Sequence, residues 1–120
     1  MWDSRAVVRV REDAGVFIVI VAGEVDHDED DLLGAAWEEA HDAGPSATVV
    51  DLSGVTFADS ALLNTLLHAH ERHRDDGRAL LLAGPLHPEV RALFTLTGTF
   101  THFTFVPSLQ HVLHKRKTED

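Results

Sequence analysis

Mostly apolar runs constrain the fold of this chain more than any other feature of its sequence. Residues 16–23 (VFIVIVAG) and 47–54 (ATVVDLSG) are rich in β-branched side chains, and residues 78–84 (RALLLAG) form a third run. Runs of this length and composition are typical of strands buried within a sheet. Residues 5–11 alternate apolar and polar side chains, which predicts a half-exposed strand, and Gly15 permits a hairpin turn between it and the next strand.

Apolar residues at helical spacing occupy the intervals between these strands. The first set ends at residues 44–45 (GP), the second at residues 75–77 (DDG), and the third lies within residues 88–98. The three sets are Leu32, Leu33, Ala36, Trp37 and Ala40; Leu62, Leu63, Leu66, Leu67 and Ala69; and Val90, Leu93 and Phe94. A short strand at residues 103–106 and a closing helix at residues 107–114 complete the pattern.

This order of elements predicts one α/β domain over residues 1–120. We expect a mixed central β-sheet that is opened by a β-hairpin, with about four helices packed against it. The final residues 115–120 (KRKTED) are expected to be a disordered tail, because chain ends without apolar side chains are seldom held in place.

Charge and composition exclude several classes of function. The chain has 20 acidic residues against 10 lysines and arginines, a net charge of −10. This balance argues against binding to nucleic acid or to an anionic membrane surface, and it favours a partner with basic residues. There is no cysteine, no apolar run long enough to span a bilayer and no signal sequence at the N-terminus. We therefore expect a cytoplasmic protein.

The junction between the strand at residues 47–54 and the following helix carries one acid and one serine, Asp59 and Ser60. Either side chain could cap the helix, because the first N–H groups of a helix lack partners within it. Ser60 could also be a phosphorylation site, since a phosphate gains from the free N–H groups and the positive end of the helix dipole. Residue patterns alone leave both interpretations open.

The segment VVDLSGVTFADSALLNTLL (residues 49–67) resembles the core signature of STAS domains, the family of bacterial anti-sigma factor antagonists. In that family a strand ending Asp-Leu-Ser-Gly-Val is followed by a short loop, then by Asp-Ser-Ser-Gly and a leucine-rich helix. Residues 23–26 (GEVD) are similar to the family's Gly-Glu-Leu-Asp, and residues 80–98 are similar to its third strand–helix unit. The resemblance extends from residue 5 to about residue 114.

This resemblance implies a function. Antagonists of the family bind an anti-sigma factor that carries an ATP-binding serine-kinase domain, and binding releases the sigma factor. The kinase phosphorylates the serine that follows the aspartate, which breaks the complex, and a serine phosphatase restores it. By motif position Ser60 is the phosphorylated residue. The alternative on the same fold is a phosphorylation-independent scaffold or a small-ligand sensor.

The resemblance also indicates a docking surface. Asp59 would orient Ser60, and the acidic loop residues Glu24, Asp26 and Asp28 would contact a basic rim of the partner. The family's second serine and its glycine are replaced by the pair Ala61 and Leu62. Because neighbouring helical residues differ by about 100°, we expect either Leu62 or Leu63 to lie near the surface beside Ser60. These residues are the predicted partner-binding set.

No catalytic or metal-binding constellation accompanies this motif. The acids of residues 24–31 (EVDHDEDD) alternate as in a calcium loop, but the required glycine and glutamate are replaced by Asp31 and Trp37. These acids are better explained by a helix N-terminus. The histidines of residues 68–73 (HAHERH) lack metal-ligand spacing and predict a solvated face, as do His111 and His114. We therefore expect a binding protein without a cofactor, not an enzyme.

Overall fold

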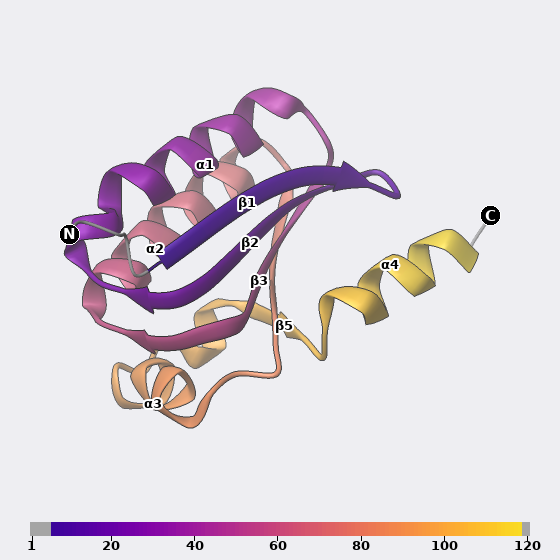
Figure 1. Ribbon diagram of the computed structural model, residues 1–120. Helices are drawn as coiled ribbons and strands as arrows, with labels where there is room; N and C mark the ends of the chain where they lie inside the picture. The colour runs from indigo at the N-terminus through magenta and orange to yellow at the C-terminus, as the bar shows by residue number, and fades with distance from the viewer. Residues whose placement is uncertain (1–5, 119–120) are drawn as a thin grey trace.

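The computed structural model describes residues 6–118. Two strands form the opening hairpin, β1 (Ala6–Asp13) and β2 (Val16–Val25), and three further strands follow: β3 (Ala47–Ala58), β4 (Ala79–Ala83) and β5 (Thr104–Val106). The strands form one sheet in the order β1-β2-β3-β4-β5 (Figure 1). β1 is antiparallel to β2, and the other pairs are parallel. The expected mixed sheet with an opening hairpin is confirmed.

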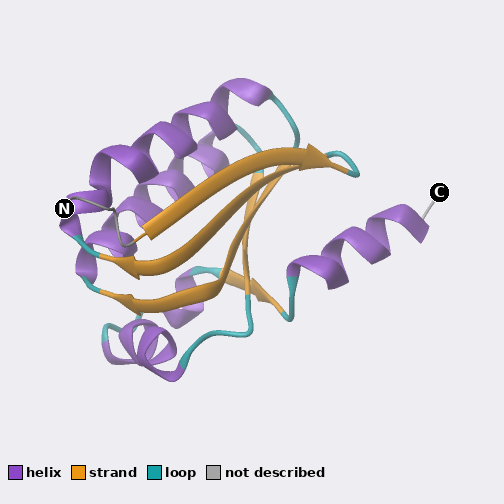
Figure 2. Cartoon of the chain, in the orientation of Figure 1, coloured by secondary structure: helices purple, strands orange, loops and turns teal. Residues whose placement is uncertain are grey.

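Four α-helices connect and follow the strands (Figure 2). They are α1 (Asp30–Ala43), α2 (Ser60–Asp75), α3 (Pro88–Leu96) and α4 (Leu109–Thr118), with short 3-10 turns at His27–Glu29 (η1) and Phe100–His102 (η2). Helices α1 and α2 lie side by side on one side of the sheet (Figure 1). The first helix ends where predicted, at Gly44, whose φ of 91° is left-handed and suits a residue without a side chain.

The sheet is buried on both faces because side chains of β2 and β3 alternate between two apolar clusters. Val19, Val21 and Leu52 belong to the larger cluster with α1, α2 and α3. Ile18 and Val49 belong to the smaller cluster, where they pack with α4. This arrangement explains why the sequences of these strands are apolar at nearly every position.

β3 is longer than its sequence predicts. We expected it to end at Gly54, but it continues to Ala58 and pairs with β2 as far as Val25. The pairing shifts register near Ala22, and a Cβ atom on Gly54 would lie 2.9 Å from the Cβ of Ala22. The glycine therefore permits the close approach of the two strands, and the strand leads almost directly into α2.

The prediction of a disordered C-terminal tail is wrong for residues 115–118, which continue α4. The Nε of Arg116 donates to the carbonyl of Ala14 at 2.9 Å, and the Nζ of Lys117 donates to Asp13 at 3.2 Å. Basic side chains at a helix C-terminus also interact favourably with its dipole. These contacts with the β1–β2 turn hold the last turn of the helix, and residues 119–120 lie outside the described part of the chain.

A buried histidine joins α2 to β3, so the predicted solvated histidine face is wrong at His73. The ring is 2% exposed, its Nδ1 lies 2.8 Å from the carbonyl of Ala69, and its Nε2 lies 2.8 Å from the hydroxyl of Thr48. A carbonyl only accepts, so Nδ1 carries the proton and Nε2 accepts from Thr48. Burial lowers the pKa of His73, and the bond to the Ala69 carbonyl partly opposes this shift.

The other histidines of this segment occupy two kinds of environment. His70 is half-buried and packs edge-on against the ring of Phe103, with the ring centroids 5.5 Å apart. His68, His111 and His114 are exposed, as expected. The sequence spacing alone did not separate these cases, because the contacts come from strands and loops distant in the chain.

The side chain of Arg78 binds backbone carbonyls around the C-terminal end of α1. Its guanidinium donates to two carbonyls in the last turn of α1 and to one just after the helix: Nη2 to Ala40 at 2.6 Å, Nη1 to His41 at 3.0 Å and Nε to Pro45 at 2.8 Å. Carbonyls at the C-terminal end of a helix lack partners within it, and the side chain of Arg78, the residue before β4, donates to them here.

Candidate functional site

The junction between β3 and α2 is a single residue, Asp59, and this residue is the helix cap. Its Oδ1 accepts from the N–H of Ala61 at 2.8 Å, and its carbonyl accepts from the N–H of Leu62 at 3.2 Å. Its own N–H donates to the carbonyl of Val25 at 3.2 Å. Of the two capping candidates that the sequence offered, Asp59 therefore takes the role, and Ser60 is the first helical residue.

Ser60 is exposed at the N-terminal end of α2. Within residues 6–118 its hydroxyl makes no hydrogen bond to another residue of the protein. Because the capping bond is supplied by Asp59, the Ser60 hydroxyl is not required for the start of the helix. The side chain is thus accessible to another molecule.

The expected apolar docking residues beside Ser60 are buried, so this part of the sequence prediction is wrong. Leu62 is 0% exposed and Leu63 is 4% exposed, and both belong to the larger apolar cluster with residues of the sheet, α1 and α3. Two helical neighbours can both be covered when a helix contacts more than one element. Ala61 is half-buried and forms part of the surface next to Ser60.

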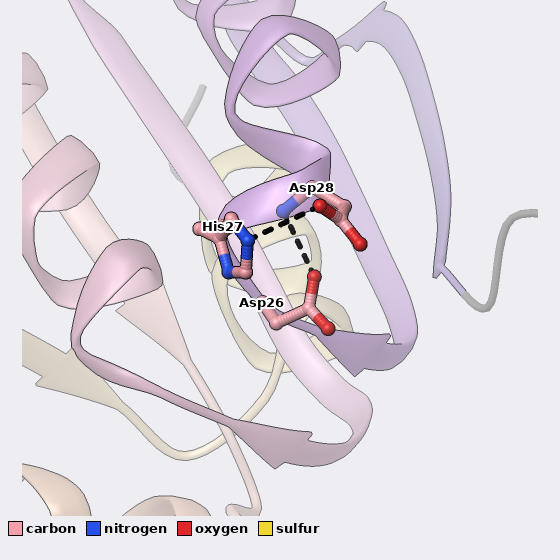
Figure 3. Close-up of side chains that lie close together, drawn as sticks. All are labelled: Asp26, His27 and Asp28. Carbon is pink, nitrogen blue, oxygen red and sulfur yellow. Dashed lines mark hydrogen bonds and ion pairs between the residues drawn. The ribbon is translucent and has the colours of Figure 1, made fainter.

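The acidic residues before α1 cap the short turn η1, which agrees with their assignment to a helix start (Figure 3). The Oδ1 of Asp26 accepts from the N–H of Asp28 at 2.9 Å, and Glu29 accepts from the N–H of Asp26 at 3.1 Å. This reciprocal pair is a capping box. Asp28 is exposed beside His27, with 3.3 Å between its Oδ1 and the imidazole Nε2.

Glu24 is exposed at the end of β2, where it pairs in register with Phe57 of β3. The side chains of Asp26, His27 and Asp28 also bring one potential metal-ligand atom each within 4.8 Å of the others. The capping bonds and the surface contact between His27 and Asp28 account for this arrangement, so we assign no metal to it. Glu24, Asp26 and Asp28 thus lie at or just after the C-terminal end of β2, and α2 starts just after the C-terminal end of the neighbouring parallel strand β3.

A groove of about 910 Å³ runs between α1 and α2, with Asp59 and Ser60 at one end and Asp75 at the other. The Nε1 of Trp37 on α1 donates to the hydroxyl of Thr65 on α2 at 3.0 Å inside it. Sequence patterns did not reveal this groove, because it depends on how the two helices lie relative to each other. The period of apolar residues gave only the buried side of each helix.

Comparison with known proteins places the chain in a family. The model of the family described as "Mlab, STAS domain" matches residues 8–106. The chain belongs to the STAS family. This STAS domain has 28% identity to an anti-sigma factor antagonist from Mycobacterium paratuberculosis, over 93% of this chain and 94% of that chain, with a TM-score of 0.82.

Two further solved structures share the fold of this STAS domain. The anti-sigma factor antagonist SpoIIAA in its unphosphorylated form is 16% identical, over 95% of this chain and 100% of that chain, with a TM-score of 0.76. The Bacillus cell fate determinant SpoIIAA in its phosphorylated form is 14% identical, over 91% and 98%, with a TM-score of 0.69. The expected STAS-like fold is therefore confirmed. Within residues 6–118, none of the helices has the length and apolar character that a membrane span requires.

Proposed function

We propose that this STAS domain is an anti-sigma factor antagonist that is switched by phosphorylation of Ser60. It binds an anti-sigma factor with an ATP-binding serine-kinase domain, and this binding releases the sigma factor. Phosphorylation of Ser60 by that kinase ends the complex, and a serine phosphatase restores it. The protein acts in the cytoplasm as a binding partner and kinase substrate, not as an enzyme.

The observation that carries this proposal is the exposure of Ser60 directly after the capping residue Asp59. The Asp-Ser order resembles the family's phosphorylation motif, and relatives of the same fold include an antagonist known in phosphorylated and unphosphorylated forms. Because Asp59 supplies the cap, Ser60 can be modified without loss of the hydrogen bond that starts α2.

Local electrostatics explain how one phosphate would end a contact. A phosphate adds roughly −1.5 to −2 charges at neutral pH. At this end of the groove the lining residues include two carboxylates, Asp30 and Asp59, whereas Arg72 lies 12 residues along α2 from Ser60, a rise of about 18 Å along the helix axis. The phosphate would therefore stay hydrated, and removing its water in a protein interface is costly.

The proposed docking surface differs from the one that sequence patterns suggested. Leu62 and Leu63 are excluded because they are buried. The surface comprises Ser60 and Ala61, together with the neighbouring acids Glu24, Asp26 and Asp28. It is polar and acidic, which fits a partner with basic residues at its rim.

A second candidate function is a phosphorylation-independent scaffold or small-ligand sensor. The groove favours it, because a volume of about 910 Å³ lies within the range of small-molecule sites, about 300–1,000 Å³. On this alternative, an acidic residue at position 60 would leave partner binding unchanged.

Paired baits test the proposal. Ser60→Ala and Ser60→Asp are used to capture partners from a lysate of the native organism, and mass spectrometry identifies what each retains. We expect an anti-sigma factor with a kinase domain on Ser60→Ala but not on Ser60→Asp. Ser46→Asp is the matched control, because it adds the same charge at an exposed serine just before β3.

Two results would count against the switch. Equal retention of the partner by Ser60→Ala and Ser60→Asp would show that charge at this position does not control binding. Loss of the partner with Ser46→Asp as well would show that added charge acts at any position. Intact-mass analysis of the wild-type protein from the same organism then reports whether it carries a phosphate group.

A further inference from the structure

The groove between α1 and α2 has an excess of negative charge. Its lining includes five carboxylates against one guanidinium, with two imidazoles; these residues are Asp30, Glu38, Asp59, Glu71, Asp75, Arg72, His27 and His68. The guanidinium of Arg72 is bound to Glu38 across the groove. Arg72 is the only Lys or Arg among the lining residues, so none remains to balance the other four carboxylates. The groove therefore favours a cationic occupant.

The floor of the groove is built from small side chains. Gly34, Ala61 and Ala69 contribute to it beside the hydrogen-bonded pair of Trp37 and Thr65. A Cβ atom on Gly34 would meet no atom within 4 Å, so the packing of the described chain does not require a glycine there. A glycine in a helix interior costs about 1 kcal/mol relative to alanine. Its absent side chain leaves the middle of the groove open.

The length of the groove fits a helix better than a small molecule. Its lining residues recur along α2 from Asp59 to Asp75, which spans about 24 Å at 1.5 Å per residue. Glu71 and Asp75 are four residues apart and so lie on one face of α2, one turn apart. Cations one turn apart on a second helix would match this spacing.

We propose that the groove binds a Lys/Arg-rich helix of the protein partner, with one end of that helix next to Ser60. This inference rests on the proposed function, in which Ser60 lies in the partner-binding surface, and it adds the chemistry of the bound segment. The acids Glu71 and Asp75, which are not paired with Arg72, supply salt-dependent attraction along the groove. The contact at Ser60 supplies the switch.

A labelled peptide tests the groove directly. The probe is a synthetic helix-forming peptide of about 16 residues, the length that spans the groove, with Lys and Arg along one face and Leu and Ala elsewhere. A second peptide has the same composition with its charges distributed around the helix. Binding is measured by fluorescence anisotropy at low and physiological salt, and amide chemical shifts identify the residues contacted.

Two pairs of variants separate groove binding from general attraction to an acidic protein. Glu71→Lys with Asp75→Lys reverses charge in the groove, whereas Glu39→Lys with Asp42→Lys makes the same change in net charge at exposed positions of α1 outside it. We expect the groove pair to weaken binding about tenfold or more, and the control pair about threefold or less.

Gly34 provides the test of shape. Gly34→Trp fills the open middle of the groove and should weaken binding about tenfold, whereas Gly34→Ala should bind like the wild type. Circular dichroism verifies that each variant is folded. Equal losses for the two charge-reversed pairs, unchanged binding by folded Gly34→Trp, or equal affinity for the two peptides would each overturn the inference.

The peptide assay contains no kinase and no phosphate, so its outcome is independent of the switch. If it fails while the paired baits behave as expected, Ser60 controls a partner that does not use the groove. If it succeeds while the baits fail, the groove binds a basic helix but Ser60 does not regulate it.

Discussion

The assignment of the helix cap to Asp59 and not to Ser60 gives a sharp prediction about stability. The bond from the Ala61 N–H to the Asp59 carboxylate is 2.8 Å long and half-buried. Replacing a capping Asp by Ala costs about 1 kcal/mol, within a range of about 0.5–2 kcal/mol. Asp59→Ala should therefore lower the free energy of unfolding by that amount and the melting temperature by about 3–6 °C.

Two further variants divide this effect into its parts. Asp59→Asn keeps an oxygen that can accept the Ala61 N–H and loses only the attraction between a negative charge and the helix dipole, about 0.3–1 kcal/mol. Ser60→Ala should change stability by less than about 0.5 kcal/mol, because the Ser60 hydroxyl makes no hydrogen bond within residues 6–118.

Urea denaturation followed by tryptophan fluorescence and by circular dichroism measures all three variants. Trp37 of α1 is buried in the larger apolar cluster, so its emission changes when the protein unfolds. A loss on Ser60→Ala as large as that on Asp59→Ala would refute the assignment of the cap. It would also mean that phosphorylation of Ser60 disrupts the helix start, so the proposed switch would act through unfolding of α2 and not through surface charge.

Three further predictions concern stability. Thr48→Val leaves the Nε2 of buried His73 without a donor and should cost about 1–3 kcal/mol in urea denaturation, whereas Thr48→Ser should retain the bond and lose less. Burial lowers the pKa of His73 in the folded state below its usual value of 6.5, so the unfolded state binds a proton at this imidazole more readily. The free energy of unfolding should therefore be greatest above pH 6.5 and decline as the pH falls below it. His73→Leu should reduce that dependence. If the wild-type and His73→Leu curves stay parallel from pH 7.5 to about pH 5, His73 is not the titrating group. Arg78→Met removes three hydrogen bonds to carbonyls in and just after the last turn of α1, and it should lower the free energy of unfolding by about 1–3 kcal/mol. A melting temperature equal to that of the wild type would show that water replaces these bonds.

The order of strands and helices followed from the sequence because apolar periodicity records which faces are buried. The hairpin, the parallel centre and the end of α1 at Gly44 could all be predicted in this way. The extension of β3 to Ala58 could not, because it depends on a register shift opposite Ala22. The helical extension through residues 115–118 depends on contacts with the β1–β2 turn, about 100 residues earlier in the chain.

The candidate site was predictable in its motif but not in its shape. The Asp-Ser pair identified the junction, yet both residues were possible caps until the bond from Ala61 to Asp59 was located. Leu62 and Leu63 were expected to differ in exposure, and both are buried because α2 contacts several elements at once. The spacing of the histidines in residues 68–73 did not indicate that the imidazole of His73 is buried and the imidazole of His68 is exposed.

The single-residue junction between β3 and α2 has a mechanical consequence for the proposed switch. The carboxylate of Asp59 accepts from the N–H of Ala61, and the N–H of Asp59 donates to the carbonyl of Val25. No flexible linker therefore separates the sheet from the helix. A change at Ser60 has no hinge through which to spread. The unmodified and phosphorylated states of the domain would then have the same backbone structure. They would differ only in the charge of the surface at Ser60 and so in which partners that surface binds.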